Sequence, residues 1–226
     1  MKKQQYTEAY DTFSHYIAMV PGSSSGYYNR ALACVGLDRT SEALSDIDRT
    51  LQLKPDDVDA LWLRFKINAR RREVIQEDTT ASLSGRSMRH TMESTLAVLM
   101  LEDLDALVRL DRTDVQALNE RGRLRHEQGD YDAALANYDA ALVLCDTCSW
   151  LLYNKALTLK ASWRGREAIP LLEKLIQADS ADGETWLLLG ECYFGLGRRQ
   201  EACDAFARSM HLGVVEAEER FRTLCE

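Results

Sequence analysis

The sequence contains few of the residues that form tight turns. It has 3 prolines and 12 glycines among 226 residues, which argues against a β-sandwich or β-barrel, because their many short strands need frequent turns. No segment approaches the roughly 18 consecutive apolar residues that span a bilayer. The charged start at positions 1–6 leads into no apolar run, unlike a secretory signal. We therefore expect a cytoplasmic protein without membrane insertion.

Basic residues are fewer than acidic ones. The chain has 28 Lys and Arg against 36 Asp and Glu, which gives a net charge of −8. A chain this acidic does not attract phosphate backbones as a whole. The one basic run, Arg70-Arg71-Arg72, is followed at once by Glu73 and Glu77. We therefore expect no nucleic-acid partner.

Motifs for catalysis and metal binding are also missing. The four histidines, at positions 15, 90, 126 and 211, are scattered and form no HExxH motif. Neither GxSxG nor GxxxxGK[ST] occurs, and no GxGxxG follows a strand. The six cysteines lack the short regular spacings of a disulfide framework, so we expect reduced thiols in a cytosol-like compartment. The sequence predicts no enzyme, no catalytic residue, no metal site and no cofactor.

What the sequence does contain is a repeat of 34 residues. Large residues recur at Leu118, Leu152 and Trp186, and small residues recur at Ala134, Ala168 and Ala202. Each unit predicts two helices. In the unit that begins at 115, Gly129 can supply the left-handed end of the first helix, and Asp130 can cap the second.

This pattern resembles the tetratricopeptide repeat. The unit 183–216 matches it best, with Trp186, Leu189-Gly190, Tyr193, Gly197, Ala202 and Phe206 at the family's positions. The resemblance implies an all-α, right-handed superhelical solenoid of helix-turn-helix repeats, forming one domain over 1–226. We expect a half repeat at 1–23, full repeats at 24–57, 58–114, 115–148, 149–182 and 183–216, and a capping helix at 217–226.

One unit is longer than the others. The unit 58–114 has 23 extra residues, which lie at about 70–92. Apolar residues recur there at helical spacing, at Met88, Met92, Leu96, Leu99 and Met100. We expect a long helical hairpin with a flexible, Ser/Thr-rich tip near 78–87.

The resemblance also implies a concave groove lined by the first helix of each repeat. Large amphipathic side chains beside Asn and Arg are typical of an interface core, and an Asn amide can both donate to and accept from the backbone of an extended peptide. Alternatively, some of these aromatic side chains pack against adjacent repeats. The predicted groove residues are Tyr28, Asn29, Leu32, Trp62, Leu63, Lys66, Arg70, Asn119, Arg123, His126, Trp150, Tyr153, Asn154, Lys160, Leu187, Leu188 and Phe194.

Two cysteines form the only CxxC, Cys145-Asp146-Thr147-Cys148. A zinc site would need further ligands that are absent nearby, and a redox dithiol would normally follow a strand. We interpret them as two cysteines at a repeat junction, and we expect Cys34 and Cys192 to lie in the core.

The main functional prediction is a non-catalytic scaffold or adaptor that binds a peptide segment or helix of another protein in the groove. One alternative is a structural subunit that docks through the convex face and the insertion at 70–95. A second is suggested by Gly26-Tyr27-Tyr28-Asn29-Arg30-Ala31, which resembles co-chaperone repeats that bind the acidic carboxyl terminus of heat-shock proteins. Asp59 and Leu63 stand where the carboxylate clamp of those repeats needs cations. The sequence identifies neither the partner nor the oligomeric state.

Overall fold

Helices account for all regular secondary structure in residues 2–77 and 83–225, the ranges that this computed structural model describes. Within those ranges there are twelve helices and no strand. The prediction of an all-α helical-repeat protein is therefore confirmed. The chain divides into two units, Met1–Arg112 and Thr113–Glu226.

Unit 1, Met1–Arg112, consists of helices that pack against their neighbours in chain order. Small side chains at the crossings, such as Ala31, Ala43 and Ala60, are fully buried and allow close approach. Ile47 and Ile67 fill the space between them. The helices are α1 (Lys2–Met19), α2 (Ser24–Gly36), α3 (Thr40–Leu53), α4 (Val58–Glu77) and α5 (Leu83–Leu110).

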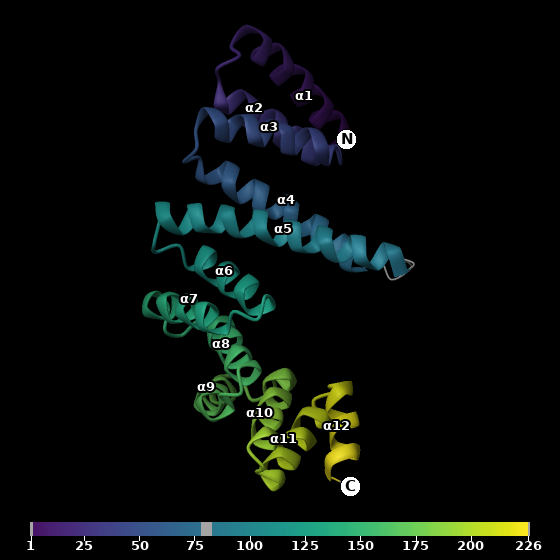
Figure 1. The fold of residues 1–226 in the computed structure, drawn as a ribbon, viewed down its shortest axis with the longest axis vertical. Helices are drawn as coiled ribbons and strands as arrows, with labels where there is room; N and C mark the ends of the chain where they lie inside the picture. Colours follow the sequence, from purple (N-terminus) through teal and green to yellow (C-terminus); the bar gives the residue numbers. More distant parts are fainter. Residues whose placement is uncertain (1, 78–82, 226) are drawn as a thin grey trace. The chain divides into compact units, whose positions relative to one another are not determined.

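The pair α4 and α5 is the longest in this unit (Figure 1). Helix α4 has 20 residues and α5 has 28, whereas α2 and α3 have 13 and 14. The extra residues of the unit 58–114 therefore extend a helical hairpin. The expected flexible tip at 78–87 falls largely outside the described residues, and the borders of the repeats remain predictions.

Ion pairs fix the register of the helix pairs in unit 1. Arg30 on α2 makes two bonds to Asp46 on α3, of 2.8 Å from Nε and 2.7 Å from Nη2. Arg64 on α4 donates from the same two nitrogens to Oδ1 of Asp103 on α5, at 2.9 and 2.6 Å. The second pair is 23 residues further apart in sequence than the first. The insertion thus preserves the internal pairing of the repeat.

Unit 2, Thr113–Glu226, also consists of helices that pack in chain order. Glycines allow close crossings here, because a Cβ on Gly122 would lie 2.7 Å from the Tyr138 ring and one on Gly190 would lie 2.6 Å from the Phe206 ring. The helices are α6 (Val115–Glu127), α7 (Tyr131–Leu144), α8 (Ser149–Ala161), α9 (Gly165–Ala178), α10 (Gly183–Gly195), α11 (Arg199–His211) and α12 (Val215–Cys225).

The predicted turn after α6 is confirmed. Gly129 has a φ of +77°, and the Asp130 side chain accepts a hydrogen bond from the Ala133 backbone N–H at the start of α7. A left-handed residue recurs 34 positions later at Trp163 and again at Gly197. The turn chemistry thus repeats with the period of the sequence.

The expectation of reduced thiols is wrong for four of the six cysteines. Cys145 and Cys148 form a disulfide at the junction between α7 and α8, and Cys203 and Cys225 form one between α11 and α12. The second pair is 22 residues apart in sequence, but helix packing brings its Cα atoms to 5.7 Å. Cys34 and Cys192 are free and buried, as predicted. The cysteines therefore no longer support the expectation of a cytosol-like compartment.

Candidate functional site

Two adjoining hollows lie along α6, α8 and α10, and they share Trp150 and Asn154 of α8. The hollow toward α6 has a volume of about 560 Å³, and the hollow toward α10 has about 360 Å³. We call this surface the α6–α8–α10 face. Its principal residues are Asn119, Glu120, Arg123, Trp150, Tyr153, Asn154, Asp182 and Glu184.

Two asparagines connect α6 and α8 in this face. Asn154 Nδ2 donates to Asn119 Oδ1 at 2.8 Å, and Asn119 Nδ2 donates to Glu120 Oε1 at 3.2 Å. Asn119 is only 6% exposed, whereas Asn154 is half-buried at the hollow. A side-chain amide has two N–H donors and two acceptor lone pairs, so one bond to Asn119 leaves Asn154 able to bind a ligand.

The face presents aromatic surface beside acidic groups. Trp150 is 44% exposed, which is unusual for a residue with so much apolar area. Burial raises the pKa of Tyr153, and the charges of Glu184 and Asp182 raise it further. Arg123 is paired with Glu120 at 3.1 Å, and the other charged residues that line the hollows, Asp182 and Glu184, are acidic. The face is therefore negatively charged near α10. Such a surface attracts a cationic group.

The predicted groove residues of unit 1 are mostly engaged within their own helices or core. Tyr28 and Leu63 pack against the buried cluster of α2–α4. The Trp62 ring meets the Phe65 ring edge-on at 5.5 Å, and Lys66 Nζ lies 5.9 Å from the Trp62 ring. The remaining three comprise Leu32, 39% exposed, Asn29, which donates to the Ser25 carbonyl, and Arg70, which pairs with Glu73.

Several predicted groove residues of unit 2 are placed differently from the expectation. Leu187 and Leu188 are 6% and 3% exposed in the core, because α10 packs against both α9 and α11 and leaves them no open side. Their assignment to the groove is corrected. Lys160 and Phe194 line a separate pocket beside α12. Of the predicted residues, Asn119, Arg123, Trp150, Tyr153 and Asn154 come together in the α6–α8–α10 face.

His126 has a structural contact instead of an open position. Its Nδ1 lies 2.8 Å from Thr158 Oγ1 of α8, and its ring meets the Tyr131 ring at 5.5 Å. Burial lowers the pKa of His126 from its usual value of 6.5, against a smaller opposing effect of Glu127. The fold therefore favours the neutral imidazole.

This pKa predicts a loss of stability in mild acid. A lowered pKa in the folded state means that the unfolded chain binds the proton more readily. The contribution of His126 is complete above about pH 6.5 and decreases as the pH falls through the folded-state pKa. We expect urea titrations between pH 7.5 and 5 to show a steeper loss for the natural chain than for His126→Gln. Equal slopes for the two proteins would contradict this assignment.

Repeated helix pairs that pack against their neighbours in chain order identify a helical-repeat protein. Models of the tetratricopeptide repeat family match residues 101–147 and 162–209. The chain therefore contains tetratricopeptide repeats. Such repeats are non-catalytic protein-interaction modules, so a protein-interaction scaffold is the general class of function that these matches support.

The curated relatives are larger proteins. The chain is 28% identical over 119 residues, 53% of its length, to "DnaJ homolog subfamily C member 7" of Mus musculus. It is 22% identical over 191 residues, 83% of its length, to "DnaJ homolog subfamily C member 3" of Gallus gallus. The matches cover only 23% and 36% of those proteins.

Solved structures share the fold at low sequence identity. YrrB, described as a TPR protein with an unusual peptide-binding site, matches with a TM-score of 0.74 and 12% identity over 96% of this chain and 100% of YrrB. The MamA protein matches with a TM-score of 0.64 and 19% identity over 90% of this chain and 96% of MamA. Identities this low support the fold alone.

Two further findings concern the described part of the chain. None of its helices combines the length and the hydrophobicity needed to cross a membrane. Among the same residues, no three His, Cys, Asp or Glu side chains are grouped so that they could hold a metal ion. The compartment of the protein remains a prediction.

Proposed function

We propose that the α6–α8–α10 face binds an extended segment of a partner protein that contains a Lys or Arg residue. The observation that supports this most is the meeting of two hollows at Trp150 and Asn154, which gives a continuous surface across three helices. The similar fold of YrrB, a protein described as having a peptide-binding site, agrees with this use of the fold.

Each group on the face has a chemical role in the proposed complex. The amide of Asn154 binds a backbone N–H or carbonyl of the segment. The exposed Trp150 indole covers an apolar side chain or the face of a cation. Glu184, exposed at the first turn of α10, attracts the Lys or Arg.

Acidic residues of unit 1 disfavour the heat-shock co-chaperone alternative. A carboxylate clamp needs cations, and unit 1 instead places acidic groups at the corresponding surface. Burial raises the pKa of Tyr28, and the negative charges of Asp59 and Asp57 raise it further. An acidic peptide would be repelled there.

Removal of the aromatic pair tests the proposed face. Peptides that bind the full chain would be selected from a random displayed library, and their affinities measured by calorimetry. Since an interface aromatic often contributes about 2 kcal/mol, the variant Trp150→Ala/Tyr153→Ala is expected to bind about 30-fold more weakly or worse. The helix content should be unchanged.

A matched control is Val143→Ala on α7, which removes an apolar side chain that is 85% exposed. This variant should retain full affinity. Glu184→Lys should weaken binding of Lys-containing peptides, and added salt should reduce this difference. Unchanged affinity of the Trp150/Tyr153 variant for every selected peptide would exclude the face as the binding site.

A structural subunit that docks through the long hairpin is the second candidate. The observation in its favour is that Val74, Met88 and Met92 of α4 and α5 are 52%, 68% and 45% exposed. In this case Met88→Ala/Met92→Ala would lose its place in the native assembly while still binding the selected peptides. The first proposal expects this variant to keep both properties.

A further inference from the structure

A separate pocket in unit 2 is mainly apolar. It has a volume of about 370 Å³ and lies between the end of α8, α10 and α12. Phe206, which is fully buried, and Phe194, which is 45% exposed, both line it. The other apolar side chains that line it are Trp163, Cys192, Leu196 and Leu224.

Trp163 has an unusual conformation beside this pocket. Its φ is +63°, and the residues 34 positions before and after it, Gly129 and Gly197, have φ values of +77° and +75°. Glycine adopts this left-handed conformation without a steric penalty, whereas a bulky residue does so at a cost. The Trp163 side chain is 92% exposed, so little packing within the described chain offsets that cost. Strained residues of this kind cluster at binding sites.

The three charged side chains that line the pocket, Lys160, Arg220 and Glu191, have a net charge of +1. Lys160 Nζ lies 2.7 Å from Glu191 Oε2, and Arg220 Nη2 lies 3.2 Å from Glu191 Oε1. Among the residues that line the pocket, two cations thus share one carboxylate. Glu216, 3.6 Å from Arg220, is 61% exposed and does not line the pocket. The pocket is therefore complementary to an anion next to an apolar group.

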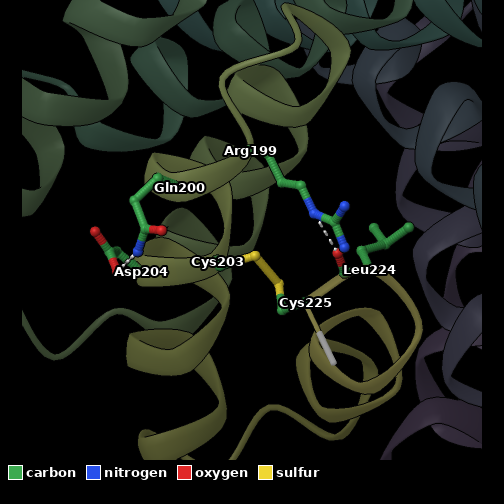
Figure 2. The surroundings of a disulfide bond; sticks show 6 residues. All are labelled: Arg199, Gln200, Cys203, Asp204, Leu224 and Cys225. Carbon is green, nitrogen blue, oxygen red and sulfur yellow. Dashed lines mark hydrogen bonds between the residues drawn. A yellow bond between two sulfur atoms is a disulfide. The ribbon is translucent and has the colours of Figure 1, made fainter.

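Helix α12 forms one wall, and a disulfide anchors that helix. Figure 2 shows the Cys203–Cys225 bond between α11 and α12, together with the 3.0 Å hydrogen bond from Arg199 Nε to the Leu224 carbonyl. Leu224 and Phe221 also pack against the buried cluster of unit 2. These contacts hold Leu224 at the pocket.

We propose that this pocket is a second binding site, for a partner segment that presents a large apolar side chain next to a carboxylate. Trp163 covers the apolar side chain, Lys160 and Arg220 face the carboxylate, and the Cys203–Cys225 disulfide positions the α12 wall. The site is separate from the α6–α8–α10 face and prefers a ligand of the opposite charge.

The test uses 8-anilinonaphthalene-1-sulfonate, which joins aromatic rings to an anion, as a fluorescent probe of the full chain. Trp163→Gly is the main variant, since glycine fits the backbone conformation. We expect its thermal midpoint to stay or rise while its probe affinity falls about tenfold or more. Val143→Ala, which removes an exposed apolar side chain outside both sites, is the control and should keep the probe. N-phenyl-1-naphthylamine, the same rings without the sulfonate, should bind more weakly than the charged probe.

Further experiments distinguish a binding site from a contact that is only structural. The peptide acetyl-Gly-Gly-Phe-Glu should displace the probe, whereas acetyl-Gly-Gly-Ser-Glu should not. Cys203→Ser/Cys225→Ser should lower probe affinity, while Cys145→Ser/Cys148→Ser should not. If Trp163→Gly keeps its probe affinity within twofold, or loses thermal stability, the proposal is overturned. If the Trp150/Tyr153 variant binds every selected peptide unchanged while acetyl-Gly-Gly-Phe-Glu still displaces the probe, only the proposed function is contradicted.

Discussion

Replacing Arg64 with Ala is expected to lower the free energy of unfolding of unit 1 by about 3–5 kcal/mol. Asp103, its partner on α5, is fully buried, and two Arg64 nitrogens donate to its Oδ1. Burial raises the pKa of Asp103, and the hydrogen bond and charge of Arg64 oppose that rise. Without Arg64 the carboxylate is buried and unpaired, which is among the most costly single changes.

Urea unfolding of the full chain, followed by circular dichroism, measures this loss. Arg70→Ala on the same helix is the matched control, because both side chains of the Arg70–Glu73 pair are exposed and such pairs contribute about 0–1 kcal/mol.

In Arg64→Ala the folded-state pKa of Asp103 should rise further, so the free energy of unfolding of this variant should decrease as the pH rises above 4. Arg64→Met/Asp103→Leu, which removes both charges, should recover much of the stability. A loss no larger than that of Arg70→Ala would refute the assigned role.

Replacing Gly190 with Leu should destabilise unit 2 by about 1–3 kcal/mol or more. A Cβ at this position would lie 2.6 Å from two carbons of the Phe206 ring, which is fully buried. The ring cannot move away without displacing the helices around it.

Gly195→Leu provides the control in the same helix. A Cβ on Gly195 meets no atom within 4 Å, and Leu favours a helix by roughly 0.8 kcal/mol over Gly. Thermal or urea unfolding should therefore show a loss for Gly190→Leu and none for Gly195→Leu. If Gly190→Leu and Gly195→Leu changed the stability in the same direction, the close crossing of α10 and α11 would not limit side-chain size.

The fold was predictable because its signal is periodic. Small residues at 34-residue intervals allow helix crossings, and Gly129 followed by Asp130 indicates a helix end and a cap; both features are present in the structure. The same period also contains signals that sequence reasoning missed. Trp163 stands at the register of Gly129 and Gly197, and the Arg30–Asp46 pair recurs as Arg64–Asp103.

The candidate site was less predictable, because one repeat position can face different surroundings in different repeats. Asn119 and Trp150 lie at the hollows, but Leu187 and Leu188 are enclosed by neighbouring helices. The Cys203–Cys225 disulfide depends on how α12 packs against α11. Sequence spacing alone does not show that distance.

The most direct test of peptide binding at the α6–α8–α10 face uses the four tryptophans as reporters. Their indole N–H signals in a nitrogen-15 NMR spectrum would be assigned with single Trp→Phe variants and followed while a selected Lys-containing peptide is added. We expect the Trp150 signal to shift in proportion to binding. Trp186, whose Nε1 donates to the Ser180 carbonyl, should stay in place. A saturating titration that moves the Trp186 signal and leaves the Trp150 signal unchanged would contradict the account.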